Sequence, residues 1–190
     1  QLGTQIAALL QAGMHVTVVT SPGPELERLP KHPNLHVQTL LIPRNVSPKS
    51  DFLAVLSLFR LFKLLSPKIV HSTTPKAGLI AAIAGFLARV PIRLHTFTGQ
   101  PWLSLRGAMR MAARLADRLI GWLNTRCYAD SLSQSQFLVR EGLIPADRIS
   151  VIGEGSLSGV DIERFDRERI GIQVRDRVRR QLGMSSDIPI

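Results

Sequence analysis

The chain of 190 residues contains a single cysteine, Cys127. One thiol cannot form an internal disulfide framework, so the small disulfide-stabilised secreted domains are excluded. A single unpaired thiol is typical of proteins in a reducing compartment. We therefore expect a thiol buried in apolar surroundings and a cytoplasmic protein.

Long apolar runs and metal-ligand patterns are also missing. The longest apolar candidate, residues 52–65, is interrupted by Arg60 and Lys63, and it is shorter than the roughly 20 residues that span a bilayer. None of the five histidines has a second ligand at metal-like spacing. We expect no spanning helix, no metal site and no cofactor.

Aromatic residues make up 5% of the chain, and none is interleaved with a basic run. Binding of single-stranded nucleic acid needs aromatic platforms beside cations, so we expect no nucleic-acid partner. The net charge of +10 then indicates an anionic membrane surface or a phosphorylated ligand. No G-x-G-x-x-G turn follows a strand, which argues against a dinucleotide-dependent oxidoreductase.

Short β-branched runs alternate with longer helical patterns along the chain. This alternation predicts an α/β fold with a Rossmann-like, doubly wound parallel sheet. The expected strands are residues 15–20, 35–40, 68–72, 92–98, 126–129 and 149–152, and the expected helices are 3–11, 51–65, 76–88, 107–123, 133–141 and 173–182. Asp51 and Ser133 are the expected N-caps of two of these helices.

The two ends of the sequence resemble interrupted elements. Gln1 lies directly inside a helical pattern, and the last residues, Ile-Pro-Ile, are typical of a beginning strand. We interpret the chain as part of a longer protein, with the first and central strand of the sheet missing. The neighbours of that strand would keep unpaired edges, so we expect an open gap in the sheet or exposed apolar surface.

The stretch 71–78, HSTTPKAG, lies where an expected strand turns into a helix. Thr74 is the expected N-cap of that helix. The hydroxyls of Ser72 and Thr73, the free amides of the first turn and the Lys76 ammonium would converge at a helix N-terminus, which stabilises anions. A phosphate is the expected ligand; the alternative is a solvent-facing helix start without a ligand.

Other strand ends carry similar groups. Gly99 and Trp102 follow the fourth expected strand in a tight turn, where the indole could stack on a sugar ring. Arg44, in a proline-flanked loop, offers a planar fork for phosphate or carboxylate. The alternatives are that Trp102 ties its loop to the core and that Arg44 pairs with Asp51.

Four arginines recur at every fourth residue of the expected helix 107–123 and just before it: Arg106, Arg110, Arg114 and Arg118. On a helix they form one stripe that repels itself unless an anion neutralises it. We therefore expect peripheral docking on the anionic inner face of the cell membrane. The alternative is a solvent-facing helix surface on which a nearby aspartate, Asp117, offsets part of the repulsion among the arginines.

Six segments, in order, resemble the N-terminal half of a glycosyltransferase family 4 enzyme of GT-B fold. They are AGMHVTVVTSPG, PRNVSPKSDF, PKIVHSTTPKAGLIAAIAG, VPIRLHTFTGQPW, the stretch from RLADRLI to YADSLSQSQFLVREG, and GEGSLSGVDIERF. The relatives that it resembles build bacterial surface polysaccharides on a lipid carrier. The resemblance implies retaining transfer of a sugar from a nucleotide-diphosphate sugar to a lipid-linked saccharide acceptor, across a cleft between two Rossmann-like domains.

The resemblance also implies a domain organisation. Residues 1–160 would form the acceptor-binding domain, and 161–190 the crossover and the start of the donor-binding domain, so the chain alone would be inactive. The expected acceptor-binding residues are Arg44, His71, Thr73, Thr74, Lys76, Gly99 and Trp102. The expected donor-side residues are Thr98, Glu154 and Ser156, and no catalytic residue is assigned.

Two positions depart from the family pattern. Thr98 stands where many relatives have a histidine that contacts the donor sugar, and Thr73 stands where relatives often have a second histidine. Threonine can bond a sugar hydroxyl but cannot shuttle a proton near neutral pH. The alternative function is a non-catalytic Rossmann-like ligand-binding or scaffold domain.

Overall fold

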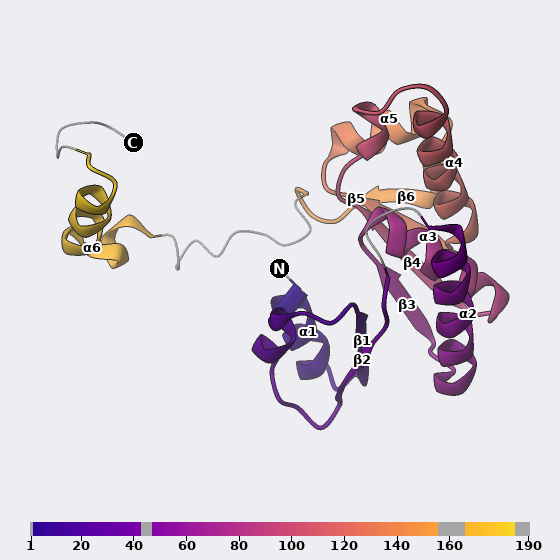
Figure 1. The fold of residues 1–190 in the computed structure, drawn as a ribbon, viewed down its shortest axis with the longest axis horizontal. Helices are drawn as coiled ribbons and strands as arrows, with labels where there is room; N and C mark the ends of the chain where they lie inside the picture. Colours follow the sequence, from indigo (N-terminus) through magenta and orange to yellow (C-terminus); the bar gives the residue numbers. More distant parts are fainter. Residues whose placement is uncertain (1, 43–46, 156–165, 185–190) are drawn as a thin grey trace. The chain divides into compact units, whose positions relative to one another are not determined.

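The computed structural model describes residues 2–42, 47–155 and 166–184 (Figure 1). The chain divides into two compact units, Gln1–Ser158 and Gly159–Ile190. The second unit holds helix α6, Arg167–Gln181, which is interrupted at Gly171, where φ is 63° and ψ is 144°. The sequence predicted only the part of this helix after the interruption.

Strands and helices alternate through the first unit, as the sequence predicts. The strands are β1 Val16–Thr20, β2 Leu35–Thr39, β3 Ile69–Ser72, β4 Ile92–Phe97, β5 Arg126–Ala129 and β6 Ile149–Val151. The helices are α1 Leu2–Gln11, α2 Pro48–Leu65, α3 Pro75–Leu87, α4 Gly107–Leu123 and α5 Leu132–Arg140, and short 3-10 helices cover Pro24–Arg28, Pro101–Leu103 and Ala146–Arg148.

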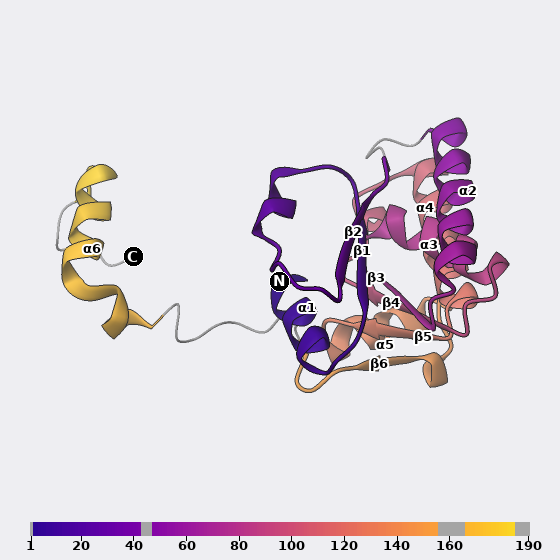
Figure 2. The ribbon, with the colours of Figure 1, turned by 90° about the horizontal axis from the view of Figure 1, so that it is seen from below.

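All strand pairs are parallel, and they form two sheets (Figure 2). One has the order β1-β2 and the other the order β3-β4-β5-β6. The α/β fold class predicted from the sequence is therefore confirmed. Among the described residues β1 and β3 are not paired.

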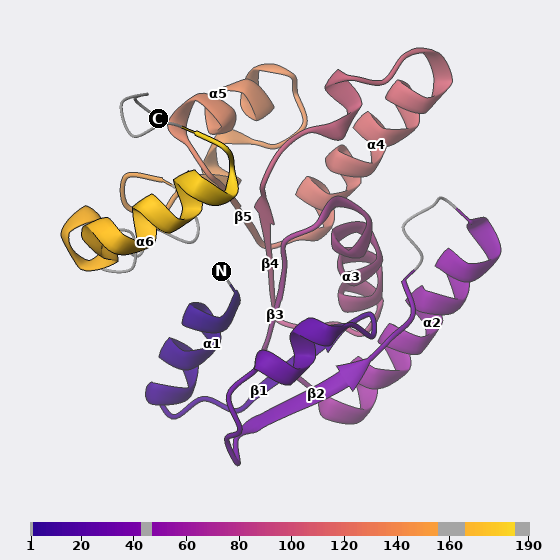
Figure 3. The same cartoon turned by 60° about the vertical axis from the view of Figure 1, so that its left-hand side comes forward.

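Helices α2, α3 and α4 form a layer against the larger sheet, with α3 in contact with both of its neighbours (Figure 3). Gly78 of α3 permits close packing, because a Cβ at this position would lie 2.4 Å from His95 Cε1 of β4. The core around β5 is apolar, and Cys127 in it is fully buried. The expectation of a buried thiol is therefore confirmed, and burial raises the pKa of the Cys127 thiol to about 12.

Two of the predicted caps are wrong. Helix α2 begins one turn earlier than predicted, with Ser47 as its N-cap, and Asp51 Oδ2 instead accepts a hydrogen bond from the Ser47 N–H at 3.2 Å. Helix α5 is capped by Ser131, whose Oγ accepts from the Gln134 N–H at 3.2 Å. In both cases the true N-cap is a serine that precedes the predicted cap in the sequence. The backbone is extended at this serine and helical from the next residue on.

Candidate functional site

The carboxyl ends of β3, β4 and β5 lie at one edge of the larger sheet, because the strands are parallel and adjacent. Ligands of doubly wound sheets bind at such edges. The loops after β3 and β4 are joined directly, since the Thr98 hydroxyl donates to the Thr73 carbonyl at 3.4 Å. Thr73, which was predicted to bind the acceptor, and Thr98, which was predicted on the donor side, therefore lie together.

Two histidines near these strand ends are held by hydroxyl groups. His71 Nε2 lies 2.8 Å from Thr96 Oγ1, and His95 Nδ1 lies 2.9 Å from Ser72 Oγ. His95 is buried, and burial, with a smaller contribution from repulsion by His71, lowers the pKa of His95 to about 3. Burial also lowers the pKa of His71. Both rings are therefore neutral at neutral pH, which suits them to hydrogen bonding rather than to a cationic role.

The start of α3 combines a free hydroxyl with a paired cation. Thr74 occupies the N-cap position as predicted, but its side chain makes no capping hydrogen bond, and the residue is exposed. Lys76 Nζ lies 2.7 Å from Asp51 Oδ1, which joins α3 to α2. Asp51 thus pairs with the lysine, whereas the sequence suggested Arg44 as its partner; Arg44 lies outside the described residues.

The loop after β4 is anchored by Trp102. Its ring is 1% exposed, its Nε1–H donates to Asp117 Oδ2 at 2.7 Å, and it stacks on Phe137 at 5.7 Å between ring centroids. A buried indole cannot stack on a sugar, so the structure favours the alternative that Trp102 ties its loop to the core. Gly99, just before this loop, has a φ of 153°, a conformation that favours glycine.

Asp117, the partner of Trp102, is itself buried in α4. Burial raises the pKa of its carboxyl to about 6, and the hydrogen bond from Trp102 opposes this shift. The guanidinium groups of Arg110 and Arg114 lie 5.8 Å from the centre of the Trp102 ring. The Trp102–Asp117 pair is thus a buried polar contact that fixes the β4 loop.

Three of the four arginines of the predicted stripe, Arg106, Arg110 and Arg118, are exposed, and Arg114 is partly buried. Arg114 forms an ion pair with Glu141 at 3.0 Å and also donates to the Glu141 carbonyl, and Arg110 packs over Trp102. Arg106 is the N-cap residue of α4, and Arg118 is exposed. Glu141 therefore pairs with one member of the stripe, and the membrane docking expected from the stripe stays a prediction.

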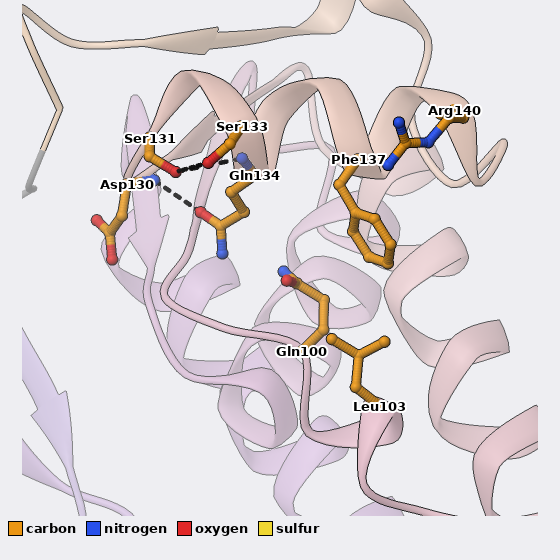
Figure 4. Close-up of a pocket in the computed structure, with 8 residues that line it drawn as sticks. All are labelled: Gln100, Leu103, Asp130, Ser131, Ser133, Gln134, Phe137 and Arg140. Atoms are coloured by element: carbon orange, nitrogen blue, oxygen red, sulfur yellow. Dashed lines mark hydrogen bonds between the residues drawn. The ribbon is translucent and has the colours of Figure 1, made fainter.

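A cavity of about 440 Å³ opens at the ends of β4 and β5 (Figure 4). Its walls come from the β4 loop, from the start of α5 and from the face of α5 that points toward this loop. The lining residues are Gln100, Leu103, Asp130, Ser131, Ser133, Gln134, Phe137 and Arg140. They combine a carboxylate, two amides and two hydroxyls with an aromatic ring and a guanidinium group.

Hydrogen bonds fix the polar end of this cavity. Gln134 Oε1 accepts from the Asp130 N–H at 2.8 Å, and the Ser131 and Ser133 hydroxyls lie 3.0 Å apart. On the opposite wall, Gln100 extends from the β4 loop toward α5 (Figure 4). Its Nε2 is buried and has no hydrogen-bond partner among the described residues. A buried donor without a partner is costly, so a bound acceptor atom would stabilise this wall.

The loop after β6 reaches the rim of the cavity. Gly155 has a φ of 102°, and a Cβ there would lie 2.5 Å from the Asp130 carbonyl oxygen. Glu154, predicted on the donor side, precedes this contact and is exposed. Ser156, the other predicted donor-side residue of this loop, lies outside the described residues.

The cavity was not predicted from the sequence, although its signal was present. Residues 130–134, DSLSQ, follow an expected strand just as residues 72–76 do. The same strand-end argument would have selected Asp130 and Gln134. The sequence patterns of this segment predict only a helix start.

Among the described residues, no group of three or more histidine, cysteine, aspartate or glutamate side chains could hold a metal ion. No described helix combines the length and apolar character needed to cross a bilayer.

Comparison with known proteins identifies the family. Residues 2–155 match the glycosyl transferase 4-like domain. The chain is 32% identical over 161 residues to the capsular polysaccharide biosynthesis glycosyltransferase CapM of Staphylococcus aureus, covering 85% of this chain and 42% of CapM. It is 29% identical over 133 residues to the UDP-Gal:alpha-D-GlcNAc-diphosphoundecaprenol alpha-1,3-galactosyltransferase of Escherichia coli, covering 68% of this chain and 33% of that enzyme.

Two solved structures share the fold. HepE of Anabaena, in complex with UDP and glucose, has a TM-score of 0.56 at 18% identity, with 79% of this chain and 38% of HepE covered. The UDP-GlcNAc 2-epimerase of Neisseria meningitidis, bound to UDP-GlcNAc, has a TM-score of 0.53 at 17% identity, with 92% of this chain and 54% of the epimerase covered. The chain spans less than half the length of the two curated relatives. The match over most of its length shows that the chain belongs to the glycosyl transferase 4-like domain family.

Proposed function

We propose that this domain supplies the acceptor site of a retaining glycosyltransferase. The complete enzyme would transfer a sugar from a nucleotide-diphosphate sugar to a lipid-linked saccharide in surface polysaccharide synthesis. The observation that carries the proposal is the cavity at the ends of β4 and β5, whose side chains offer hydrogen-bond partners of both kinds beside an aromatic ring. Sugar hydroxyls need donors and acceptors together, and an aromatic ring packs against their C–H faces.

Each wall of the cavity has a part in this proposal. The Asp130 carboxylate accepts hydrogen bonds from sugar hydroxyls, and the Gln100 Nε2 donates to a hydroxyl or ring oxygen and so gains the partner that it lacks. Phe137 forms the apolar wall. Arg140, whose guanidinium lies 5.9 Å from the centre of the Phe137 ring, marks the end that suits an anionic group.

The start of α3 is proposed to hold the acceptor phosphate. The free Thr74 hydroxyl, the amides of the first turn and Lys76 are arranged at a helix N-terminus, where negative charge is stabilised. The ion pair with Asp51 orients the lysine side chain. Arg44 and the donor-side residues Thr98, Glu154 and Ser156 complete the proposed site.

The relatives support this assignment. The name of the Escherichia coli relative describes transfer from UDP-Gal to a diphosphoundecaprenol-linked sugar, and the HepE structure contains UDP and glucose. A lipid-linked acceptor and a uridine nucleotide donor are therefore the first candidates for this protein. We place the reaction in the cytoplasm, at the inner face of the membrane, because the buried free thiol suits a reducing compartment.

Kinetics of the complete enzyme with a lipid-linked acceptor test the proposal. Replacing Gln134 or Lys76 by alanine should lower kcat/KM for the acceptor by roughly ten- to hundredfold, because each loses one polar contact, while the donor KM changes little. Gln38→Ala, in an exposed part of β2, is the matched control and should have no effect. Equal losses for donor and acceptor would contradict the acceptor assignment, and absence of turnover with every nucleotide sugar would favour the non-catalytic alternative.

A further inference from the structure

The outer side of the α2–α3–α4 layer exposes large apolar side chains. On α4, Met111, Leu115 and Trp122 are 74%, 57% and 65% exposed. Their spacing of four and seven residues places them on one helical stripe. Met109 is also exposed, but its position on the helix is well to the side of this stripe, so it offers a matched control.

The apolar stripe continues onto the other two helices. Phe86 of α3 lies 6.0 Å from Trp122 between ring centroids, which links α3 to α4. On α2, Phe52 and Leu64 are 68% and 81% exposed. Because α3 contacts both α2 and α4 (Figure 3), these side chains belong to one layer. We call this surface the helix-layer face and define it by Phe52, Leu64, Phe86, Met111, Leu115 and Trp122.

The charges on this layer have one sign. Arg60, Lys63 and Arg118 are exposed on α2 and α4. The carboxylates of the three helices are Asp51, which pairs with Lys76, and Asp117, which is buried. The helix-layer face therefore combines exposed apolar side chains with cations and has no unpaired exposed carboxylate from its own helices.

We propose that the helix-layer face docks on the surface of an anionic lipid bilayer. Apolar and aromatic side chains interleaved with arginine and lysine suit the boundary between acyl chains and anionic headgroups. A second copy of the same face is a poor partner, because its charges have the same sign. The proposal does not rest on the sugar chemistry, since none of the defining residues lines the cavity.

This surface differs from the arginine stripe that the sequence suggested. Arg110 and Arg114 lie over the Trp102 ring at the side of α4, whereas the helical spacing of Arg118 places it within the stripe of Met111, Leu115 and Trp122. Phe52 of the helix-layer face follows Asp51 in the sequence, and Asp51 pairs with Lys76 at the start of α3. One end of the helix-layer face thus adjoins the strand-end site.

Vesicle co-sedimentation of the chain tests the proposal. Binding is expected to vesicles of phosphatidylglycerol and phosphatidylethanolamine, to weaken with added salt, and to be slight with phosphatidylcholine alone. Arg118→Gln should lower the partition coefficient roughly fivefold, the effect of about one basic contact near an anionic leaflet, while Arg110→Gln should change it little. Met111→Ser should lower it roughly tenfold, while Met109→Ser should not. Circular dichroism checks that each variant is folded.

Tryptophan fluorescence gives a second readout. The chain has two tryptophans, of which Trp102 is buried and Trp122 is exposed. Anionic vesicles should shift the emission of Trp122 to shorter wavelength and allow its quenching by brominated lipid, and Trp122→Phe should abolish the shift. Equal losses for Met109→Ser and Met111→Ser, binding that ignores lipid charge and salt, or capture of polyglutamate but not of vesicles would overturn the proposal.

Discussion

The buried carboxyl of Asp117 should make the stability of this domain depend on pH. Asp117 is 3% exposed, and burial raises the pKa of its carboxyl from 3.8 to about 6. Below about pH 3 both the folded and the unfolded protein carry the proton. As the pH rises toward 6, the unfolded chain releases it first, so the contribution of Asp117 to stability is lost over this range.

The size of this effect follows from the shift. A difference of roughly two pKa units corresponds to about 3 kcal/mol of stability lost between pH 4 and pH 6. Asp117→Asn removes the buried charge but keeps an oxygen that can accept from the Trp102 Nε1–H. We expect this variant to match the wild type near pH 4 and to be more stable by up to about 3 kcal/mol above pH 6.

Urea unfolding at a series of pH values measures this difference. Comparing the two proteins at each pH cancels the titration of His71 and His95, which is common to both. Asp117→Leu is the control, because it removes the charge and also the acceptor, and leaving the indole N–H unpaired costs about 1 to 3 kcal/mol. A difference between Asp117→Asn and wild type that does not change with pH, or that grows toward acid, would refute the reasoning.

Three further predictions concern the elements around the site. Gly78→Ala should destabilise the domain by about 1 to 3 kcal/mol, seen as a lower Tm, because the new Cβ would lie 2.4 Å from His95 Cε1; an unchanged Tm would show that the helix shifts freely. His95, whose pKa falls to about 3, should contribute stability that is complete above pH 6.5 and is lost as the pH falls toward 3, so His95→Asn should flatten the acid limb of the unfolding curve. Ser131→Ala should cost about 1 kcal/mol through loss of the α5 cap, measured by urea unfolding, whereas Ser133→Ala should be nearly neutral.

Local patterns were sufficient for the architecture and for the polar strand ends at which we propose the site. Alternating strand and helix patterns predicted the parallel α/β fold, and every predicted strand of the first unit is present within one or two residues. The turn chemistry of residues 72–76 predicted a helix start at Thr74, which the structure confirms. These features depend on neighbours in sequence, so periodicity and capping preferences are enough to predict them.

Cap positions were harder to predict, because several polar residues compete at the same turn. Both Ser131 and Ser133 are polar residues near the start of α5. Which of them becomes the N-cap depends on the residue at which β5 ends and the backbone turns into the helix. The same holds for Ser47 and Asp51 in α2. Sequence alone offers both candidates with similar capping preference.

The residue types of the sequence determined that this protein has a parallel α/β fold with polar strand ends; only the tertiary structure decided which side chains meet there. Trp102 had two alternatives, and packing against Phe137 and Asp117 buries it. The cavity joins Gln100 to Gln134, which no local pattern relates. Burial and ion pairing depend on groups far apart in the chain, and their energies are decided only when folding removes those groups from water together.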